Sequence, residues 1–444
     1  MQSGHAPSSA IVVPVAKLLI RRGCRVLLAS NPRRSWQIRN GLADKMRCVL
    51  LVPALVVFFV AIWILVPPFH VGLVPFAVGA PELSVWFLLA ALGISALCLT
   101  ASNNAHGARA ALVIAAAAAV LFAYPLARAP FTLAAFDRAM EDGLGRDYAN
   151  QIPPAMAASL REHALSPADF VLGIARADVL VRRGVEFAKP GGVRLTLDVY
   201  GPPAAGPRPV VIQLYGGAWR GGSPEDNGSF ATWLASKGYL VVAADYRHAP
   251  EATWPAQIED VRTALDWIRS HASEFEADPA RIALIGRSAG AQLALVAAYQ
   301  ASAPAVRAVV SYYGPTDLVE GWREPPRPDP LDVRAILETY LRGTPDSARD
   351  RYREASPVTY ASARVPPTLL LYGSRDHVVE ARFGRELHDR LRQAVATSVL
   401  LEFPWAEHAF DALPNGLSGQ ISLYYTERFL AWALRPEPYA ARRK

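Results

Sequence analysis

Cysteine is scarce in this sequence of 444 residues, and its few occurrences lie near one end. Cys24, Cys48 and Cys98 are the only three, so the chain beyond them contains no thiol. Their absence there excludes disulfide bonds and thiolate metal sites from most of the protein. A region without thiols functions in oxidising and in reducing compartments alike, so cysteine content does not decide the location of the protein.

Charged residues are missing from three long runs near the N-terminus, at 48–69, 83–102 and 110–127. About 20 apolar residues in a helix cross the hydrocarbon core of a bilayer. The first two runs reach this length, whereas the third is shorter and rich in alanine. The alternatives are buried core helices and, for the first run, a signal peptide, for which the basic lead is too long. We therefore predict a membrane domain over 46–128 with three transmembrane helices.

Positive charge is concentrated before the first of these runs. Residues 1–47 contain nine Lys or Arg and one Asp, a net +8, whereas the whole chain has +7, which leaves 7 − 8 = −1 for the remainder. A nucleic-acid-binding protein would spread such charge over a folded face, so we expect no nucleic-acid partner. Basic residues beside a first span favour retention of that side, here residues 1–45, in the cytoplasm. Met46, directly before the first run, is an alternative start.

The number of crossings decides the side of the membrane on which the rest of the chain lies. Three crossings would place everything after about residue 130 outside the cytoplasm, in a periplasmic or extracellular location. If the third run does not span, the same region is cytoplasmic. We predict the extracytoplasmic placement.

From about residue 184 the pattern changes to short apolar runs that alternate with amphipathic segments. We expect strands at 194–201, 209–217, 240–246, 281–286, 305–314, 368–374 and 398–405, and helices at 230–239, 255–275, 289–301, 381–394 and 419–434. This alternation predicts an α/β domain over 184–444 with a mainly parallel sheet covered by helices on both faces. The pattern breaks at 315–357, where we predict a cap over the site, and residues 129–183 are expected to form a neck and a second part of the cap.

A serine lies between two glycines where an expected strand turns into an expected helix, in the sequence RIALIGRSAG at 281–290. Gly286 and Gly290 remove side chains that would clash at such a tight turn, and the following helix directs its N-terminal N–H groups to the same place. This is the pattern of a nucleophile elbow, which makes Ser288 the candidate nucleophile. The motif alone is weak, and its place between a strand and a helix strengthens it.

A serine nucleophile needs a base, and the base needs an orienting acid. Asp376 follows the expected strand at 368–374, and His408 follows the strand at 398–405, in the order expected for this architecture. We predict that His408 takes the serine proton while Asp376 holds its other ring nitrogen. His377, His388, Glu380 and Asp317 are weaker alternatives.

The glycine-rich turn YGGAW at 215–219 closes an earlier strand. Glycines there allow the backbone to approach a ligand and to direct N–H groups at an oxyanion. We predict the N–H groups of Gly217, Ala218 and Ala289 as oxyanion donors, with Gly216 and Trp219 against the substrate. A simple turn is the alternative.

These motifs together resemble the α/β-hydrolase superfamily, and specifically the hormone-sensitive-lipase-like and related carboxylesterases. The resemblance covers about residues 185–435 and includes DYRHAPEATWPAQIEDV (245–261), YYGPTDL (312–318) and SPVTY (356–360). It implies a serine ester hydrolase without metal or organic cofactor. Three positions depart from the family pattern: Tyr215 replaces a histidine, Ala218 replaces a glycine, and Arg287 replaces an acid. Residues 245–247, the DYR segment, we interpret as structural.

The leading hypothesis is a membrane-anchored serine carboxylesterase that hydrolyses small or medium acyl esters through an acyl-enzyme, in a pocket whose apolar walls include Trp219, Trp254 and Trp322. Lipid esters are compatible with it, because the anchor keeps the site near a bilayer. One alternative is an amide hydrolase of the same fold, similar to prolyl peptidases or arylformamidases. Another is a non-catalytic binding module, which predicts a broken catalytic position. The sequence does not predict the oligomeric state.

Overall fold

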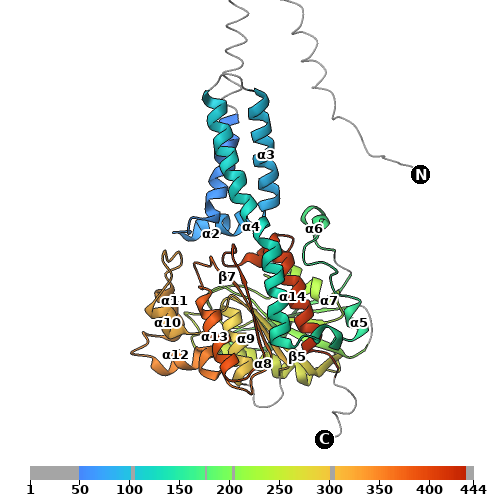
Figure 1. The fold of residues 1–444 in the computed structure, drawn as a ribbon. Coiled ribbons are helices and arrows are strands. Elements are labelled where there is room, and N and C mark those ends of the chain that lie inside the picture. The colour runs from blue at the N-terminus through green and yellow to red at the C-terminus, as the bar shows by residue number, and fades with distance from the viewer. Residues whose placement is uncertain (1–49, 102–105, 176–177, 203–205, 301–305, 437–444) are drawn as a thin grey trace, which may run out of the picture.

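The computed structural model describes residues 50–101, 106–175, 178–202, 206–300 and 306–436. It consists of an α/β domain and, standing on one side of it, a bundle of long helices, which we call the stalk (Figure 1). The stalk contains the helix Leu50–Ile64, α3 (Ser84–Ala101) and the first part of α4 (His106–Leu144). The basic segment 1–45 and Met46 lie outside the described residues.

The domain is built on one sheet of eight strands in the order β1-β2-β4-β3-β5-β6-β7-β8. Strand β2 runs antiparallel to both β1 and β4, and all other neighbours are parallel. The strands are β1 (Leu180–Ala188), β2 (Leu195–Gly201), β3 (Arg208–Leu214), β4 (Leu240–Ala244), β5 (Ala277–Arg287), β6 (Ala308–Tyr312), β7 (Thr368–Gly373) and β8 (Ser398–Phe403). The predicted α/β class with a mainly parallel sheet is confirmed.

Helices cover both faces of the sheet, which is why the central strands are apolar along their whole length. On one face lie α8 (Ala256–Ser270), α9 (Ala289–Gln300) and α13 (Arg382–Gln393), and on the other α7 (Gly228–Ala235), α14 (Leu417–Ala433) and the second part of α4 (Figure 1). Every residue of β4, β6 and β7 is buried. Such strands are recognisable in the sequence as short runs of valine, leucine and alanine.

Strand β1 was not predicted. It is an edge strand, its first four residues are exposed, and its pairing with β2 shifts register between Arg182 and Val185. Since neither face of β1 is consistently buried, its sequence has no alternation of apolar and polar residues to detect.

The predicted cap lies between β6 and β7 at the carboxyl edge of the sheet. It contains α10 (Leu318–Arg323), α11 (Val333–Leu341) and α12 (Arg349–Ala355). The segment 129–183 contains the end of α4, two short helices, α5 (Pro154–Ala157) and α6 (Pro167–Leu172), and the start of β1. No residue of this segment lines the cavity described below, so its part in the cap stays a prediction.

Among the described residues, only α4 is by itself long and apolar enough to cross a membrane. The helix α3 qualifies only together with α2 (Val74–Glu82), from which it is bent by 79°, and the apolar helix Leu50–Ile64 is shorter than a span. The expectation of three separate transmembrane helices is therefore not supported. The run predicted at 110–127 is part of a much longer helix, because the helical pattern continues into polar sequence that packs on the domain.

Helix α4 belongs to both parts of the molecule. Its 39 residues correspond to a length of about 58 Å. Ala111 and Phe122 are buried among the stalk helices, whereas Phe136 and Met140 belong to the main core of the domain. The ring of Phe136 lies 4.9 Å from that of Phe403 at the end of β8. One continuous helix thus connects the stalk to the sheet.

Two further contacts join the stalk to the carboxyl edge of the sheet. Arg375, just beyond β7, donates from Nη2 to the carbonyl oxygen of Leu65 at 2.5 Å. The buried carboxyl group of Glu82 at the end of α2 accepts hydrogen bonds from the N–H groups of Ser418 (2.7 Å) and Gly419 (3.3 Å) in the first turn of α14. These groups have no partner inside their own helix, so the contact also caps α14.

Candidate active site

Ser288 lies at the turn between β5 and α9, with a positive φ of 51°. A Cβ atom on Gly286 would lie 2.2 Å from the carbonyl oxygen of Gly290, and one on Gly290 would lie 2.2 Å from that of Tyr215. Both positions therefore exclude a side chain, as the sequence motif predicted. The strained turn directs the serine side chain out of the sheet into the crevice at its carboxyl edge.

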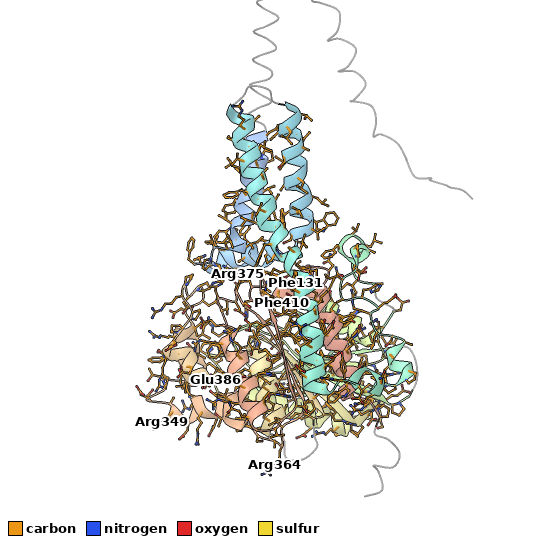
Figure 2. The ribbon with its side chains drawn as sticks, in the orientation of Figure 1. Phe131, Arg349, Arg364, Arg375, Glu386 and Phe410 are labelled. Atoms are coloured by element: carbon orange, nitrogen blue, oxygen red, sulfur yellow. The ribbon has the colours of Figure 1, made fainter. Side chains whose placement is uncertain are left out.

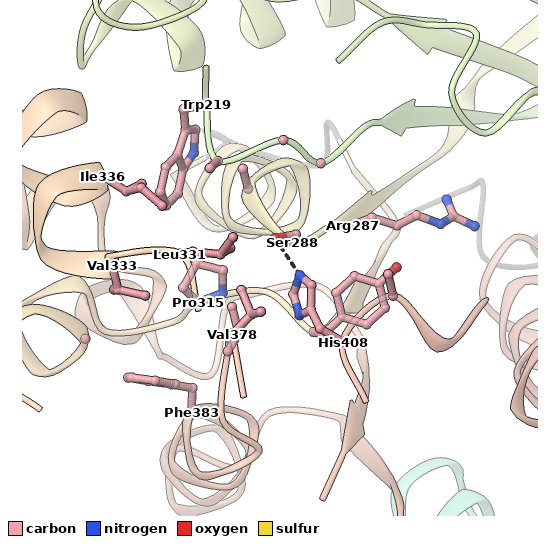
Figure 3. A pocket seen from close by; sticks show the side chains of 18 of the residues that line it. Trp219, Arg287, Ser288, Pro315, Leu331, Val333, Ile336, Val378, Phe383 and His408 are labelled. Carbon is pink, nitrogen blue, oxygen red and sulfur yellow. Dashed lines mark hydrogen bonds between the residues drawn. The ribbon is translucent and has the colours of Figure 1, made fainter. Parts of the chain in front are cut away.

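The structure brings Ser288, His408 and Asp376 together. His408 Nε2 lies 3.1 Å from Ser288 Oγ (Figure 3). His408 Nδ1 lies 2.8 Å from Asp376 Oδ2. The other carboxylate oxygen of Asp376 accepts the N–H groups of Val378 (2.8 Å) and Val379 (2.7 Å). Because a carboxylate only accepts, Nδ1 carries the proton and Nε2 presents a lone pair to the serine hydroxyl.

The pKa of His408 is raised above its ordinary value of 6.5. Burial on its own would lower the pKa, but the charge of Asp376 and its hydrogen bond outweigh burial, and Glu407 and Asp411 add to the effect. The side chain of Asp376 is fully buried and that of His408 is 12% exposed, so water screens this attraction weakly. The site therefore favours a positive charge on the imidazole.

The alternatives weighed from the sequence lie elsewhere. His377 binds Glu407 through Nδ1 at 2.6 Å, and His388 contacts Ser398 at the opposite end of β8. Asp317 caps α10, and Glu380 pairs with Arg382. None of the four contacts Ser288 in the described structure.

Glu407 is a positioning residue that the sequence interpretation missed. It is buried, and its Oε1 accepts the N–H groups of His377 (2.6 Å) and of His408 (3.0 Å). One carboxylate thus joins the loop that carries Asp376 to the loop that carries the histidine. The available signal was a glutamate directly before the histidine in a segment that is otherwise apolar.

The turn after β3 has the backbone conformation of a donor loop. Gly217, Ala218 and Trp219 all have positive φ, of 123°, 55° and 57°. All three line the cavity together with Gly216 and Ala289. Among the hydrogen bonds of the described residues, the N–H groups of Gly217, Ala218 and Ala289 have no acceptor. They are free to bind an oxygen atom of a ligand.

A cavity of about 530 Å³ contains Ser288 and His408. Its apolar side is formed mainly by the cap and by α13, as Figure 3 shows for Val333, Ile336 and Phe383. The polar lining residues include Asp226, Asn227, Arg287 and Asp411. Arg287 lies on the other side of Ser288 from Val333 and Phe383 (Figure 3). The cavity therefore has an apolar part and a polar part, as small-molecule sites commonly do.

Only one of the three predicted tryptophan walls lines this cavity. Trp219 does so, stacked on Tyr340 of the cap at 4.1 Å and hydrogen-bonded to Gln292 at 2.9 Å. Trp254 instead packs edge-on against Tyr340, and Trp322 donates to Glu338 on α11. Trp254 contacts the cap through its ring and Trp322 through its indole N–H, so both pack against cap residues and neither forms a wall of the cavity.

Arg287, which replaces an acid of the family pattern, has an acidic partner in the fold. It does not contact the DYR segment, and its Nε donates to Asp411 Oδ2 at 2.5 Å. The two side chains are 5% and 8% exposed, and Asp411 also accepts a hydrogen bond from Tyr313. The guanidinium lies 4.5 Å from the ring of Phe230. Burial would lower the pKa of Arg287, but Asp411 and the tyrosines raise it, so the pair is ionic.

Tyr215 replaces the family's histidine without entering the site. Its hydroxyl contacts Asp245 at 2.5 Å and His248 at 2.9 Å, and its ring stacks on Tyr246. Arg247 forms a salt bridge with Asp260. The DYR segment therefore holds the donor loop from behind, as the structural interpretation predicted.

Comparison with known proteins agrees with this geometry. A family model described as BD-FAE matches residues 197–391. The chain is 35% identical over 252 residues to a probable carboxylic ester hydrolase, LipM, of Mycobacterium tuberculosis, which covers 53% of this chain and 57% of the relative. It is 36% identical over 228 residues to the esterase LipC of the same organism, covering 48% and 56%. The chain spans little more than half the length of these curated relatives.

Solved structures show the same fold at low sequence identity. The bacterial heroin esterase aligns with a TM-score of 0.52 and 23% identity, over 65% of this chain and 99% of that one. An esterase of the archaeon Pyrobaculum calidifontis aligns with a TM-score of 0.51 and 21% identity, over 65% and 93%. The chain has the α/β-hydrolase fold, and the relatives that it resembles in sequence are carboxylic ester hydrolases.

Proposed function

We propose that this protein is a serine carboxylesterase in which Ser288, His408 and Asp376 form the catalytic triad. The observation that carries the proposal is the pair of contacts at His408, 3.1 Å to the serine hydroxyl and 2.8 Å to the buried carboxylate. The names of the relatives, carboxylic ester hydrolase and esterase, support the same bond type. A non-catalytic module is disfavoured because all three positions are occupied by competent groups.

In the acylation step, Nε2 of His408 accepts the hydroxyl proton while Ser288 Oγ attacks the ester carbonyl carbon. The carbonyl oxygen gains the negative charge of the tetrahedral intermediate and is bound by the N–H groups of Gly217, Ala218 and Ala289. Asp376 stabilises the imidazolium that forms. The proton then passes from Nε2 to the alcohol oxygen, the ester bond breaks, and the acyl group remains on Ser288.

Deacylation repeats the sequence with water as nucleophile. His408 accepts a proton from water, the resulting hydroxide attacks the acyl carbon, and the carboxylic acid leaves as Oγ recovers its proton. The donor set is the same in both halves. No metal or organic cofactor is needed for either step, because the charge develops on one oxygen that backbone donors bind.

The apolar and polar parts of the cavity indicate how an ester binds. The apolar side beneath the cap, lined by Val333, Ile336 and Phe383, fits an acyl chain of small or medium length. The polar side, with Asn227 and the pair Arg287–Asp411, fits an alcohol portion that carries hydrogen-bonding groups. Gly216 and Trp219 form the wall between the donor loop and the acyl chain.

The decisive experiment compares matched aryl esters and aryl amides as substrates of the full chain. We expect turnover of the ester, labelling of Ser288 by a fluorophosphonate, and a loss of at least about 10⁴-fold in kcat for Ser288→Ala. Ser270→Ala, a serine at the end of α8 away from the cavity, is the matched control. Preferential amide turnover would assign the site to amide hydrolysis, and undiminished activity of Ser288→Ala would refute the triad.

We further propose that the stalk anchors the protein in a membrane. Arg109 and Arg128 are exposed and enclose an uncharged segment of α4, 110–127, which corresponds to about 27 Å of helix. The extracytoplasmic location is part of this proposal and requires an odd number of crossings. Protease added to intact and to opened spheroplasts tests it, since a domain outside the cytoplasm is cleaved before opening.

A further inference from the structure

The carboxyl edge of the sheet, which holds the site, faces the stalk. Figure 2 shows Arg375 and Phe410 close to the base of the stalk, whereas Arg349 and Arg364 lie at the far end of the domain. Arg375 directly precedes Asp376 and contacts Leu65 in the stalk, and Phe410 follows His408 by two residues. The catalytic loops therefore lie immediately beneath the helices that we assign to the bilayer.

Exposed apolar side chains gather at this same level. Phe131 lies where α4 leaves the stalk (Figure 2), and α2 and α6 lie on opposite sides of the stalk base (Figure 1). We call six exposed apolar residues the collar: Phe69 and Val71 just before α2, Phe76 on α2, Phe131 on α4, and Val171 and Leu172 on α6. Leu172 is 84% exposed and Phe131 is 71% exposed, so neither packs in the fold.

Apolar exposure is rare in the rest of the domain. Among the described residues after 172, the exposed large apolar side chains are Leu180, Val181, Val193 and Val395. Exposed apolar side chains that gather in one region of a surface mark an interaction site. Phe131 lies one helical turn beyond Arg128, the charged end of the uncharged α4 segment, where the lipid–water boundary falls if α4 spans.

We propose that the collar docks on the lipid surface and that the site hydrolyses amphiphilic esters supplied by the bilayer. This inference rests on the proposed esterase function and names its substrate class: an ester with an apolar acyl chain and a polar alcohol portion. The acyl chain of the ester enters the apolar part of the cavity beneath the cap from the lipid side. The polar alcohol portion remains at the interface beside Arg287 and Asp411. The collar holds the crevice against the lipid surface, so that such an ester transfers without crossing water.

The test uses the full chain reconstituted in phosphatidylcholine vesicles and two substrates. One is a water-soluble short aryl ester, and the other is a long-chain umbelliferyl ester incorporated in the vesicles. Val171→Asp combined with Leu172→Asp should lower turnover of the membrane-resident ester about tenfold and leave the soluble ester unchanged. Val395→Asp is the matched control, because Val395 is 88% exposed and precedes β8 at the opposite edge of the sheet. It should change neither rate.

The outcomes separate this inference from the function on which it rests. If the collar variant loses both activities, or retains both, docking on the lipid surface is refuted. In either case, activity of the unmodified protein on the soluble ester still supports the esterase function. No soluble-ester activity in the unmodified protein overturns the esterase itself.

A spin label gives a readout that does not depend on turnover. A nitroxide at Leu172→Cys, in a background with the three cysteines replaced by alanine, should be relaxed by oxygen and shielded from a water-soluble nickel chelate, and one at Val395→Cys should show the reverse. If the chelate reaches both labels, docking on lipid is refuted. If the label at position 172 is shielded from both reagents, a protein partner covers it and docking on lipid is refuted as well.

Discussion

Removing the charge of Asp411 tests how the catalytic loops are held together. The substitution Asp411→Asn keeps the shape of the side chain and an acceptor for Tyr313, but it leaves the guanidinium of Arg287 buried without an anion. The two side chains are 5% and 8% exposed, so solvent compensates little of this loss. Removing one partner of a buried ion pair costs about 3–5 kcal/mol. At roughly 2 °C per kcal/mol for a large domain, the unfolding midpoint should fall by about 6–10 °C.

The double variant Arg287→Met with Asp411→Asn leaves no buried charge behind. Replacing a buried pair by uncharged groups is often close to neutral, so we expect the double variant to recover about 2–3 kcal/mol of the single loss. The assay is thermal unfolding of the full chain in detergent, followed by tryptophan fluorescence. Asp350→Asn makes the same chemical change in an exposed pair with Arg353 and should not shift the midpoint measurably.

Kinetics below the unfolding midpoint give a second readout. Asp411 lies three residues after His408, and the ring of Tyr313 packs 4.5 Å from the imidazole. Loosening this loop should lower kcat of the soluble ester more than it changes KM. An unchanged midpoint for Asp411→Asn, or a double variant that is less stable than the single one, would refute the argument that the buried charge pair fastens the two loops.

Four further predictions concern the site. Gly290→Ala should abolish the folded elbow and all esterase activity, because its Cβ would lie 2.2 Å from the carbonyl oxygen of Tyr215; normal turnover would contradict the geometry. The value of kcat/KM should fall as the pH drops through the raised pKa of His408, above 6.5, since the imidazolium cannot accept the serine proton. In Asp376→Asn the same limb should move to lower pH and kcat should fall by about 10³–10⁴-fold, measured in a pH series. Val333→Phe should reduce turnover of long acyl esters about tenfold and spare acetates, in a chain-length series.

The catalytic groups were predictable because strand ends and tight turns leave a local signature. Ser288 lies between glycines that no other residue can replace, and Asp376 and His408 directly follow buried apolar strands. The order of the strands in the sheet brings these positions to one edge. Sequence spacing was therefore sufficient to choose His408 over His377.

The contacts that fasten the site were less predictable, because each joins residues that are far apart in the chain. The sequence showed an arginine at position 287 where the family has an acid, but its partner could not be identified. The folded loop shows that Asp411 is that partner. Two of the three tryptophans predicted to line the cavity do not do so, because their partners are also distant in the sequence. Trp254 packs against Tyr340 and Trp322 donates to Glu338. Strand β1 was missed because exposure removes the periodicity on which prediction depends. Helices were expected beyond residue 128, but not that the first of them is continuous with the run at 110–127.

The continuity of α4 has a mechanical consequence. Helix α4 begins among the apolar segments and ends against β8, so it acts as a rigid strut. Glu82 at the end of α2 and Leu65 after the first helix are also bonded to the domain near the sheet. If the stalk lies in a membrane, as proposed, the domain is held at a fixed distance from the lipid surface and not on a flexible tether. In that arrangement the fold sets the height and tilt of the domain above the lipid. The enzyme would then meet its esters by lateral diffusion in two dimensions. The thickness of the surrounding lipid would determine how closely the crevice approaches those esters.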